Sequence, residues 1–479
     1  MTEDGSSRHL TGPRWIGDSL LVAAAIGLVY SALAPNLLWG GDSLAYIRAV
    51  STGEIDRSVH FLYLPFMRWA ADLGAVFGFD AYLSLRAASS WATALGVGVL
   101  HQAAVLMGAS RSRAVSVAVM LAVTPAVAFF GMIVEIPGVL FGATALVWLA
   151  AAMFVRKPQA LTAAAMGLAT GVAGSIHSSA HLMPLAVAAF CFVHTHLGMK
   201  RLLCFGAILG VAHVAWLVLL MVATDLLVLQ SLQDSVALVE LARELRVELG
   251  TTTSHTLHEW IIPYAPLSFV ILGALRQVQH RRELMALAVS LLAYGVMAWP
   301  LLAATWSSQL VEHGGYYLAL AFPLAWLGSA QYSLGVGKWL WTGGAILSAT
   351  LLWGETLKET SAVIPAEMRS ALGTEEATLL CHSSEDLLEV CRTLPSMVIY
   401  KADQVPGMAA RREAIYISFD RLYDSGQRSG RDVFLTDALK NAMEQASIPL
   451  GVYIRKNYAT EVLRAGGFVA HRVTRRPGG

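Results

Sequence analysis

One acidic residue stands directly after the first long apolar run of this chain. The run extends from about Ile16 to Leu38 and is followed by the motif GGDSLAY at positions 40–46. A carboxylate at the edge of a membrane span is costly unless it has a function. Asp42 is suited to act as a general base that takes a proton from an acceptor hydroxyl, or to cap a short helix.

Three more polar residues interrupt apolar sequence. Glu135, in GMIVEIPG, has apolar neighbours, so its carboxylate must be paired or hydrated. His177 and His181, in GSIHSSAHLMP, have the i, i+4 spacing at which two histidines can share a metal ion. Because no third ligand stands nearby, a polar contact to a phosphate or a sugar is the better functional interpretation. An ordinary hydrated histidine remains the alternative.

A departing phosphate group needs positive charge or hydrogen-bond donors as negative charge builds on it. Basic side chains are scarce in the segments that we expect to lie outside the cytoplasm. Ordinary solvated charge is the alternative for most of them. We single out the following groups as substrate-binding candidates: Arg48, Arg243, His258 and His313, with Tyr46 and Tyr316 beside them.

The composition places these residues in a membrane protein. Of the 479 residues, 56% are hydrophobic and 14% are charged, whereas soluble domains carry about 25% charged residues. The formal net charge of +1 gives no field that would attract nucleic acid. The apolar residues form about eleven runs of near-bilayer length, which predicts an all-α polytopic membrane protein. The runs are Ile16–Leu38, Leu83–Met107, Ala114–Gly131, Ile133–Val155, Leu161–Ile176, His181–Thr195, Leu202–Thr224, Ile261–Leu275, Leu284–Ala304, Tyr316–Ala330 and Trp339–Trp353.

A further apolar segment, Phe61–Phe79, contains Arg68 and Asp72 at i, i+4 spacing, where they can pair. We interpret it as a juxtamembrane helix that lies along the interface.

Lysine and arginine are concentrated in every second break between the apolar runs. If the N-terminus with Arg8 and Arg14 is cytoplasmic, the breaks predicted to be cytoplasmic carry most of the basic residues. The protein is then a multi-pass protein of the inner (plasma) membrane. Its external loops are 39–82 and 225–260, and the tail after the membrane domain 1–354 is extracytoplasmic. Asp42 lies on the same outer side.

The tail, 355–479, changes to the pattern of a small soluble α/β domain with a partly parallel sheet. ATLLCH, MVIYKA and AIYISFD read as strands, whereas SEDLLEVCRTL, TDALKNAMEQA and ATEVLRAGG read as helices. No G-x-G-x-x-G pattern predicts nucleotide binding. Cys381 and Cys391 could form a disulfide if the tail is external, and the sequence alone does not decide this.

At this point the sequence resembles a known family. GGDSLAYIRAVSTGEI, after the first run, resembles the opening of the membrane-embedded GT-C glycosyltransferases, the mannosyl- and arabinosyltransferase group that uses polyprenyl-phosphate sugars. HFLYLPFMRWAADLGAVFGF resembles the juxtamembrane segment of that family, and VEHGGYYLALAFPLAWLG resembles a late element of it.

The resemblance implies an enzyme that moves a sugar from a lipid-linked donor to a glycan, lipid or protein acceptor outside the cytoplasm. Asp42 matches the acid of the family's first loop, the general base of an inverting transfer, and Glu135 matches an acid often found at its turn. Many members have a second acid next to the first, where this chain has Ser43. Schemes in which paired acids hold a divalent metal ion are therefore in doubt. No cofactor is assigned, and a divalent metal ion stays an open alternative.

Two other functions remain open at this stage. A secondary transporter or flippase would place polar and broken elements at mid-membrane, often in two related halves, whereas the polar groups here collect at one rim. A polysaccharide polymerase or ligase would use arginines of a large external loop, and 225–260 does contain Arg243 and Arg246. An inactive scaffold that presents the tail would be indicated if Asp42 were dispensable.

Overall fold

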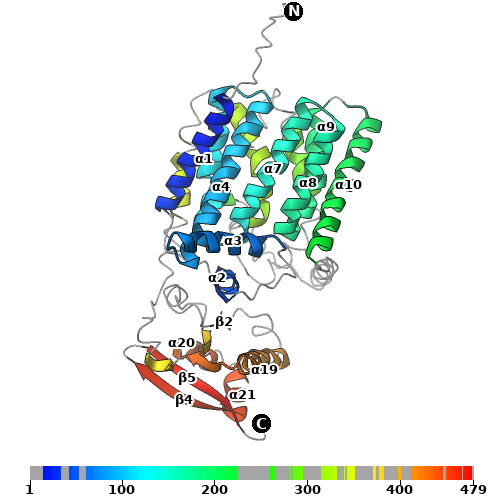
Figure 1. Cartoon of the computed structure of the whole chain (residues 1–479). Coiled ribbons are helices and arrows are strands. Elements are labelled where there is room, and N and C mark those ends of the chain that lie inside the picture. The colour runs from blue at the N-terminus through cyan, green and yellow to red at the C-terminus, as the bar shows by residue number, and fades with distance from the viewer. Residues whose placement is uncertain are drawn as a thin grey trace, which may run out of the picture. The chain divides into compact units, whose positions relative to one another are not determined.

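Figure 1 shows the computed structural model of the chain. It describes residues 14–33, 43–52, 61–195, 197–224, 259, 261–265, 267, 281, 284–294, 314–331, 339, 342–350, 370–373, 377–381, 398–401, 412–445, 449–465 and 468–476. The chain forms two compact units. The first comprises 1–34, 56–66 and 86–352, and the second comprises 35–55, 67–85 and 353–479. The predicted site residues Asp42, Arg243, His258 and His313, together with Cys391, lie outside the described residues.

The first unit is a bundle of apolar helices. The long helices α1 (Arg14–Leu33), α4 (Ala81–Leu106), α7 (Ile136–Arg156), α8 (Ala160–Ile176) and α10 (Met199–Thr224) run side by side (Figure 1). Among the described residues, three segments are long and apolar enough to cross a bilayer: Ile16–Leu33, Ile136–Arg156 and Met199–Ala223. A bent pair, α5 (Arg111–Val123) with α6 (Pro125–Met132), makes a fourth if it is one span. The predicted total of about eleven stays a prediction.

Two short interruptions shape the start of α7. Thr124 has the extended backbone that a residue before proline prefers, and α5 and α6 meet there at 63°. The chain is extended again at Glu135, where φ is −156°, before α7 begins with Pro137 in its first turn. These breaks bring polar backbone and a carboxylate to one end of otherwise apolar helices.

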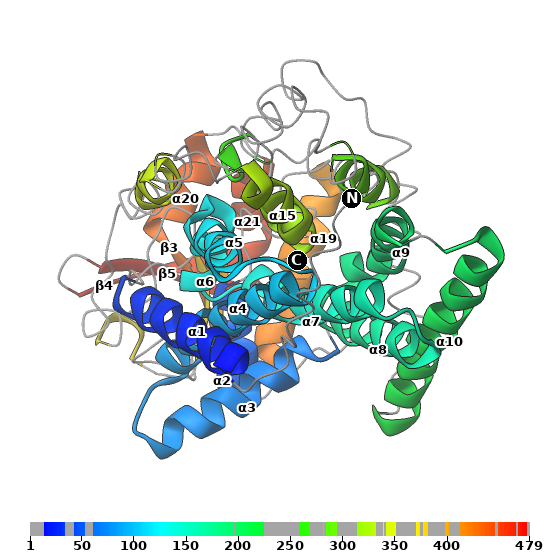
Figure 2. The ribbon, with the colours of Figure 1, turned by 90° about the horizontal axis from the view of Figure 1, so that it is seen from above.

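Helices α7, α8 and α10 lie in a row, with α8 in the middle (Figure 2). Glycines on α8 allow the close approach of α10. A Cβ atom on Gly167 would lie 2.2 Å from the carbonyl oxygen of Leu209, and one on Gly171 would lie 2.8 Å from Cβ of Trp216. Small residues at membrane-helix contacts generally serve this purpose. The packing matters here because α8 carries Thr170 and α10 carries His213, which are discussed below.

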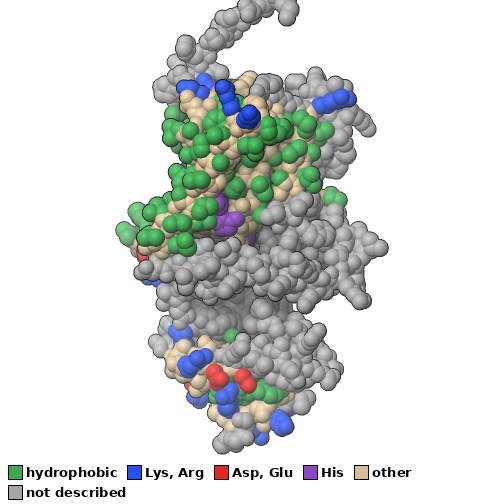
Figure 3. Space-filling model, turned by 90° about the vertical axis from the view of Figure 1, so that its right-hand side faces the viewer, with side chains coloured by type: hydrophobic (Ala, Val, Ile, Leu, Met, Phe, Trp, Pro, Cys, Tyr) green, Lys and Arg blue, Asp and Glu red, His purple; other side chains and the backbone are tan. Residues whose placement is uncertain are grey.

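Glu135 and His177 lie at the end of this unit opposite the basic residue Arg156. Helix α7 runs from Glu135 to Arg156, and a short break at Lys157 leads into α8, which returns to His177. Glu135 and His177 are therefore at the same end, and Arg156 is at the other. Figure 3 shows basic side chains at one end of a band of hydrophobic side chains and histidines toward its other margin. This is the distribution that the charge alternation predicts.

The predicted interfacial helix is α3 (Tyr63–Val76), whose 14 residues are too few to cross a bilayer. The predicted ion pair is confirmed, because Nε of Arg68 lies 3.0 Å from Oδ1 of Asp72. Trp69 and Leu73 expose their side chains on the same helix. Length, pairing and exposed apolar groups agree with a helix that lies along an interface.

The tail forms a five-stranded mixed sheet in the order β2-β1-β3-β5-β4. Strand β1 (Ala377–Cys381) pairs in parallel with β2 (Val398–Lys401) and with β3 (Asp432–Thr436). Strand β5 (Phe468–Arg475) is antiparallel to β3 and to β4 (Tyr458–Ala465). The partly parallel sheet is as predicted, and ATLLCH and MVIYKA supply its strands β1 and β2. TDALKNAMEQA supplies α20 (Asp437–Gln445), also as predicted.

Two predicted elements of the tail are wrong. AIYISFD is not a strand but part of helix α19 (Arg412–Arg428). The apolar residues Phe419, Leu422 and Tyr423 recur at helical spacing, and this longer pattern outweighs the local strand propensity of the segment. ATEVLRAGG is not a helix but forms most of β4, because pairing along the whole of β5 outweighs its local helix propensity. SEDLLEVCRTL lies outside the described residues.

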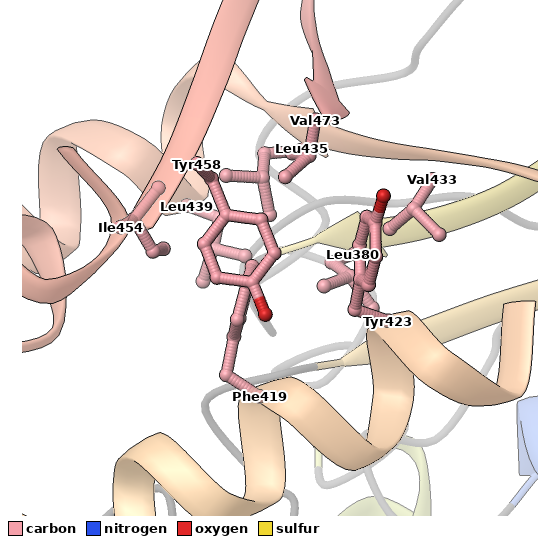
Figure 4. Close-up of a cluster of buried hydrophobic side chains, with 9 residues drawn as sticks. All are labelled: Leu380, Phe419, Tyr423, Val433, Leu435, Leu439, Ile454, Tyr458 and Val473. Atoms are coloured by element: carbon pink, nitrogen blue, oxygen red, sulfur yellow. The ribbon is translucent and has the colours of Figure 1, made fainter. Parts of the chain in front are cut away.

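The tail has its own apolar core between α19 and the sheet. Phe419 and Tyr423 project from α19 toward the ring of Tyr458 at the start of β4 (Figure 4). Their ring centroids lie 5.2 and 5.0 Å from that of Tyr458, in edge-to-face geometry. Helix α21 (Pro449–Asn457) contributes Ile454. Asp420 accepts hydrogen bonds at this core from the hydroxyls of Tyr453 (2.7 Å) and Tyr458 (2.5 Å).

We expect Asp420→Ala to destabilise the tail by about 2 kcal/mol, because it leaves two tyrosine hydroxyls without their charged acceptor. Asp432→Ala is the matched control. It removes one ion pair, to Arg472, in which both side chains are more than 40% exposed, and such pairs contribute about 0–1 kcal/mol. Hydrogen exchange of β4 and β5 amides in the full-length protein measures both changes. Equal effects of the two substitutions would contradict this account of the core.

Candidate active site

The first-loop residues lie on α2 (Ser43–Thr52), which begins directly after Asp42. Tyr46, Ile47 and Val50 are each less than 10% exposed and form one buried face of this helix. Arg68 of α3 donates a hydrogen bond to the carbonyl oxygen of Val50 at 2.6 Å. Burial therefore gives Tyr46 a packing role, and its predicted contact with substrate stays a prediction. The predicted contact of Arg48 with substrate also stays a prediction, because the structure gives only its position on α2.

Glu135 is the N-cap of α7. Its side chain is 6% exposed and accepts a hydrogen bond from the backbone N–H of Ile136 at 3.3 Å. A carboxylate at the N-terminus of a helix is stabilised by the helix dipole and by unpaired N–H groups. This explains how a carboxyl group is tolerated in apolar surroundings, at the end of the bundle where His177 also lies.

A glycine turn lies against the start of α7. Gly314 has a left-handed backbone with φ of +81°, and η4 (Gly315–Leu320) follows it. A Cβ atom on Gly315 would lie 3.0 Å from Cγ of Pro137, so the turn is next to Glu135 in space. Tyr316 belongs to η4. Nε1 of Trp148 on α7 donates to the carbonyl oxygen of Ala319 at 2.7 Å and fixes this segment on α7.

Two buried side chains clamp this turn. The carboxylate of Glu259, which is 1% exposed, accepts from the backbone N–H of Gly314 at 2.9 Å. The hydroxyl of Tyr264 donates to the carbonyl oxygen of Gly314 at 2.6 Å. Both backbone polar groups of Gly314 are therefore held from the segment that follows His258, and Gly314 itself follows His313 in the sequence. Two loops with candidate site histidines are joined at this point.

A row of polar aromatic groups connects the turn to the end of α8. The ring centroids of Tyr294 and Tyr317 lie 6.1 Å apart, and both side chains are buried. A side-chain hydrogen bond joins Tyr294 to Ser179. Ser179 in turn lies 2.7 Å from Nδ1 of His177, measured from its hydroxyl oxygen. Of the predicted residues, Glu135 lies next to the glycine turn and His177 at the other end of this row, while Tyr316 is placed only by its position on η4.

The bonds of His177 argue against its predicted alternative as a metal ligand. The backbone N–H of Ser179 donates to Nδ1 of His177 at 3.2 Å. The neutral ring therefore carries its proton on Nε2 and keeps no lone pair for a metal ion. Among the residues that the structure describes, no three histidine, cysteine or carboxylate side chains are grouped as metal ligands.

His181 lies on η1 (Ser178–Leu182), beyond His177. Its ring meets that of His213 on α10 edge-to-face, with centroids 5.2 Å apart. His181 is therefore directed toward α10 and is not paired with His177.

The sequence interpretation missed Glu259, Tyr264, Tyr294 and His213. Glu259 offered a signal, because an acid between His258 and Trp260 stands at the start of an apolar run. His213 offered one as well, because it is the single histidine inside the run Leu202–Thr224. The two tyrosines had no such signal, since tyrosine is common near membrane interfaces.

No protein-family model matches the chain, and no curated protein matches its sequence. Solved structures do match its fold. ArnT from Cupriavidus metallidurans bound to undecaprenyl phosphate has 16% identity and a TM-score of 0.53, with 96% of this chain and 98% of that chain covered. The apo state of the same protein has 15% identity and a TM-score of 0.55 over the same shares.

The Archaeoglobus fulgidus oligosaccharyltransferase in complex with Zn and sulfate has 12% identity and a TM-score of 0.46, with 93% of this chain and 71% of that chain covered. A TM-score this low gives that likeness no weight. The likeness to ArnT extends over nearly the whole of both chains, and it includes a helical membrane part and a terminal sheet in this protein. The chain therefore shares the fold of ArnT over nearly its whole length, which agrees with the resemblance to the GT-C glycosyltransferases noted in its sequence.

Proposed function

We propose that this protein is a membrane glycosyltransferase that moves a sugar from a polyprenyl-phosphate donor to an acceptor outside the cytoplasm. The observation that carries the proposal is the shared fold with ArnT over 96% of the chain, in a structure that has undecaprenyl phosphate bound. The polar rim at one end of apolar helices, from Glu135 to His177, supports it. A lipid-linked donor has its polar head at such a rim and its chain among the helices.

The proposed reaction is a direct displacement. The acceptor hydroxyl attacks the anomeric carbon of the donor, the bond from this carbon to the phosphate oxygen breaks, and the polyprenyl phosphate leaves with the electron pair. Asp42 takes the proton of the attacking hydroxyl as general base. One displacement inverts the anomeric configuration.

The leaving phosphate gains charge as the bond breaks, so nearby donors stabilise the transition state. Arg48, Arg243, His258 and His313 are the proposed donors. The clamp on Gly314 supports the pairing of the last two, because it joins the residues next to His258 and His313 by a hydrogen bond of 2.9 Å. Glu135 and Tyr316 are proposed to contact the sugar or the acceptor.

In this proposal the N-terminus is cytoplasmic, residues 1–354 form the membrane domain, and residues 355–479 form an extracytoplasmic domain. The arrangement places the rim with Glu135 and His177 on the outer side, opposite Arg156 and Lys157.

The experiment is a donor panel. The full-length protein in proteoliposomes is given labelled mannosyl- and arabinosyl-phosphoryl undecaprenol, the corresponding nucleotide sugars and an acceptor extract of cell envelopes. We expect label to leave a lipid-linked donor and to reach an acceptor, with no use of the nucleotide sugars. Transfer from a nucleotide sugar, or movement of intact lipid-linked sugar across the bilayer without cleavage, would contradict the proposal.

A further inference from the structure

A chain of side-chain hydrogen bonds runs from the middle of α8 through α10 to η1. The hydroxyl of Thr170 on α8 lies 3.0 Å from Nδ1 of His213 on α10, and Nε2 of His213 lies 3.1 Å from Nδ1 of His181. Thr170 is fully buried, and His213 is 9% exposed. The chain is therefore enclosed between two apolar helices, where each polar group needs a defined partner.

The positions of the protons in this hydrogen-bond chain follow from Thr170, the residue at its buried end. Thr170 donates its only hydroxyl proton to the carbonyl oxygen of Gly167 at 2.8 Å. Its oxygen can therefore only accept from His213, so the proton of His213 is on Nδ1. The Nε2 atom of neutral His213 is then an acceptor, and His181 must donate to it from Nδ1.

A neutral His181 consequently has no proton on Nε2. The opposite arrangement requires either a proton on both nitrogens of His213, which is costly for a group enclosed between apolar helices, or the loss of the hydrogen bond from Thr170 to Gly167. The chain ends at a helix carbonyl oxygen that accepts only, so it offers no path for conducting protons. Its effect is to fix the orientation and the tautomer of His181.

The backbone of α8 also holds the ring of His181. A Cβ atom on Gly174 would lie 2.4 Å from Nδ1 of His181, so the ring occupies the space that any other side chain at position 174 would fill. Both His177 and His181 are partly exposed at the rim, and Figure 3 shows histidine side chains at the surface at the margin of the hydrophobic band. His177 keeps its proton on Nε2, whereas His181 keeps its own on Nδ1.

We propose that Thr170 and His213 are positioning residues that fix His181 as a hydrogen-bond acceptor for a hydroxyl group of the bound sugar. An unprotonated imidazole nitrogen accepts from a hydroxyl but offers no proton to a phosphate oxygen, so His181 recognises the sugar and not the lipid phosphate. The inference rests on the proposed function for the identity of the ligand, and on the hydrogen-bond chain for the state of His181.

The first test needs no substrate. Full-length protein with ¹⁵N-labelled histidine is studied by solid-state NMR in lipid nanodiscs, and His181→Asn assigns the resonances. We expect a protonated Nδ1 and a bare Nε2 at His181 in the wild type and in Thr170→Ser, which keeps the hydroxyl. Thr170→Val keeps the volume but removes the acceptor, so part of His181 should move its proton to Nε2. A wild-type His181 with its proton on Nε2, or an unchanged spectrum in Thr170→Val, would overturn the inference.

The second test separates sugar from phosphate. Thr170→Val should weaken binding of mannosyl- or arabinosyl-phosphoryl undecaprenol by about three- to tenfold, the range of one neutral hydrogen bond, and leave the Kd for undecaprenyl phosphate unchanged. Thr170→Ser should restore the wild-type value. Equal weakening for both lipids would make His181 a phosphate contact, and a shift of its Nε2 resonance with Zn²⁺ alone would make it a metal ligand; each outcome refutes the inference.

If the proposed function is wrong, the two tests give a different combination of results. In that case the wild type transfers none of the lipid-linked sugars, while the proton position measured without any donor is unaffected.

Discussion

Replacing Asp42 with asparagine is expected to lower the rate of sugar transfer by at least about a hundredfold, the usual size of a general-base contribution. The substitution suits the question because asparagine caps helices as well as aspartate does. Helix α2 begins at Ser43, so any capping by residue 42 is kept in the asparagine variant while the basic oxygen is lost. The initial rate of label transfer in proteoliposomes measures the effect.

Asp72→Asn is the matched control for Asp42→Asn. Asp72 lies on α3, is paired with Arg68 on an exposed surface, and takes no part in the proposed reaction. Such i, i+4 pairs contribute only about 0.3–0.5 kcal/mol, so we expect transfer to stay near the wild-type rate. Wild-type turnover in Asp42→Asn would remove the base assignment, whereas absence of transfer in the wild type as well would favour a scaffold that presents the tail.

Replacing Gly314 with alanine is expected to have the second largest effect, on both stability and transfer. The left-handed backbone at φ of +81° costs an alanine about 1–2 kcal/mol. The added Cβ would also lie 2.7 Å from Cε2 of Tyr264 and 2.8 Å from Cβ of Pro263, so the clamp must shift. We expect the free energy of unfolding to fall by about 2–4 kcal/mol in total, because contacts this short force the backbone to move. Thermal unfolding of the full-length protein and the transfer rate measure it.

Gly108→Ala is the matched control for Gly314→Ala. Gly108 has φ of +90°, but no atom lies within 4 Å of the position of its Cβ. It ends the turn between α4 and α5, at the end of the bundle opposite the rim. Alanine at position 108 should lower the free energy of unfolding only by the cost of its left-handed backbone, about 1–2 kcal/mol. It should leave the transfer rate unchanged. Similar losses of transfer in both variants would show that the turn at Gly314 matters only for folding.

The sequence predicted the parts of the fold that depend on local pattern. Long apolar runs correspond to α1, α7 and α10, and the i, i+4 pair of Arg68 and Asp72 forms as expected. Prediction failed where distant pairing decides the structure. The segment that forms most of β4 has good helix formers, yet it is a strand because β5 lies beside it.

The candidate site divides in the same way. Glu135 could be found because a carboxylate among apolar residues needs an explanation, and the structure supplies one in its capping of α7. The bond between Glu259 and Gly314 joins residues that are 55 positions apart, and no local pattern indicates which loop a buried acid will reach. His213 is similar, because its partners Thr170 and His181 become neighbours only when α8 and α10 pack.

The most direct test of the account is the product of a single turnover. Wild-type protein in proteoliposomes is mixed with a labelled polyprenyl-phosphate sugar in limiting amount, and the lipid and glycoside products are separated and identified by NMR. The account predicts one polyprenyl phosphate released for each sugar transferred, and a glycoside of inverted anomeric configuration that depends on Asp42. A glycoside of retained configuration, or transfer of equal rate in Asp42→Asn, would contradict it.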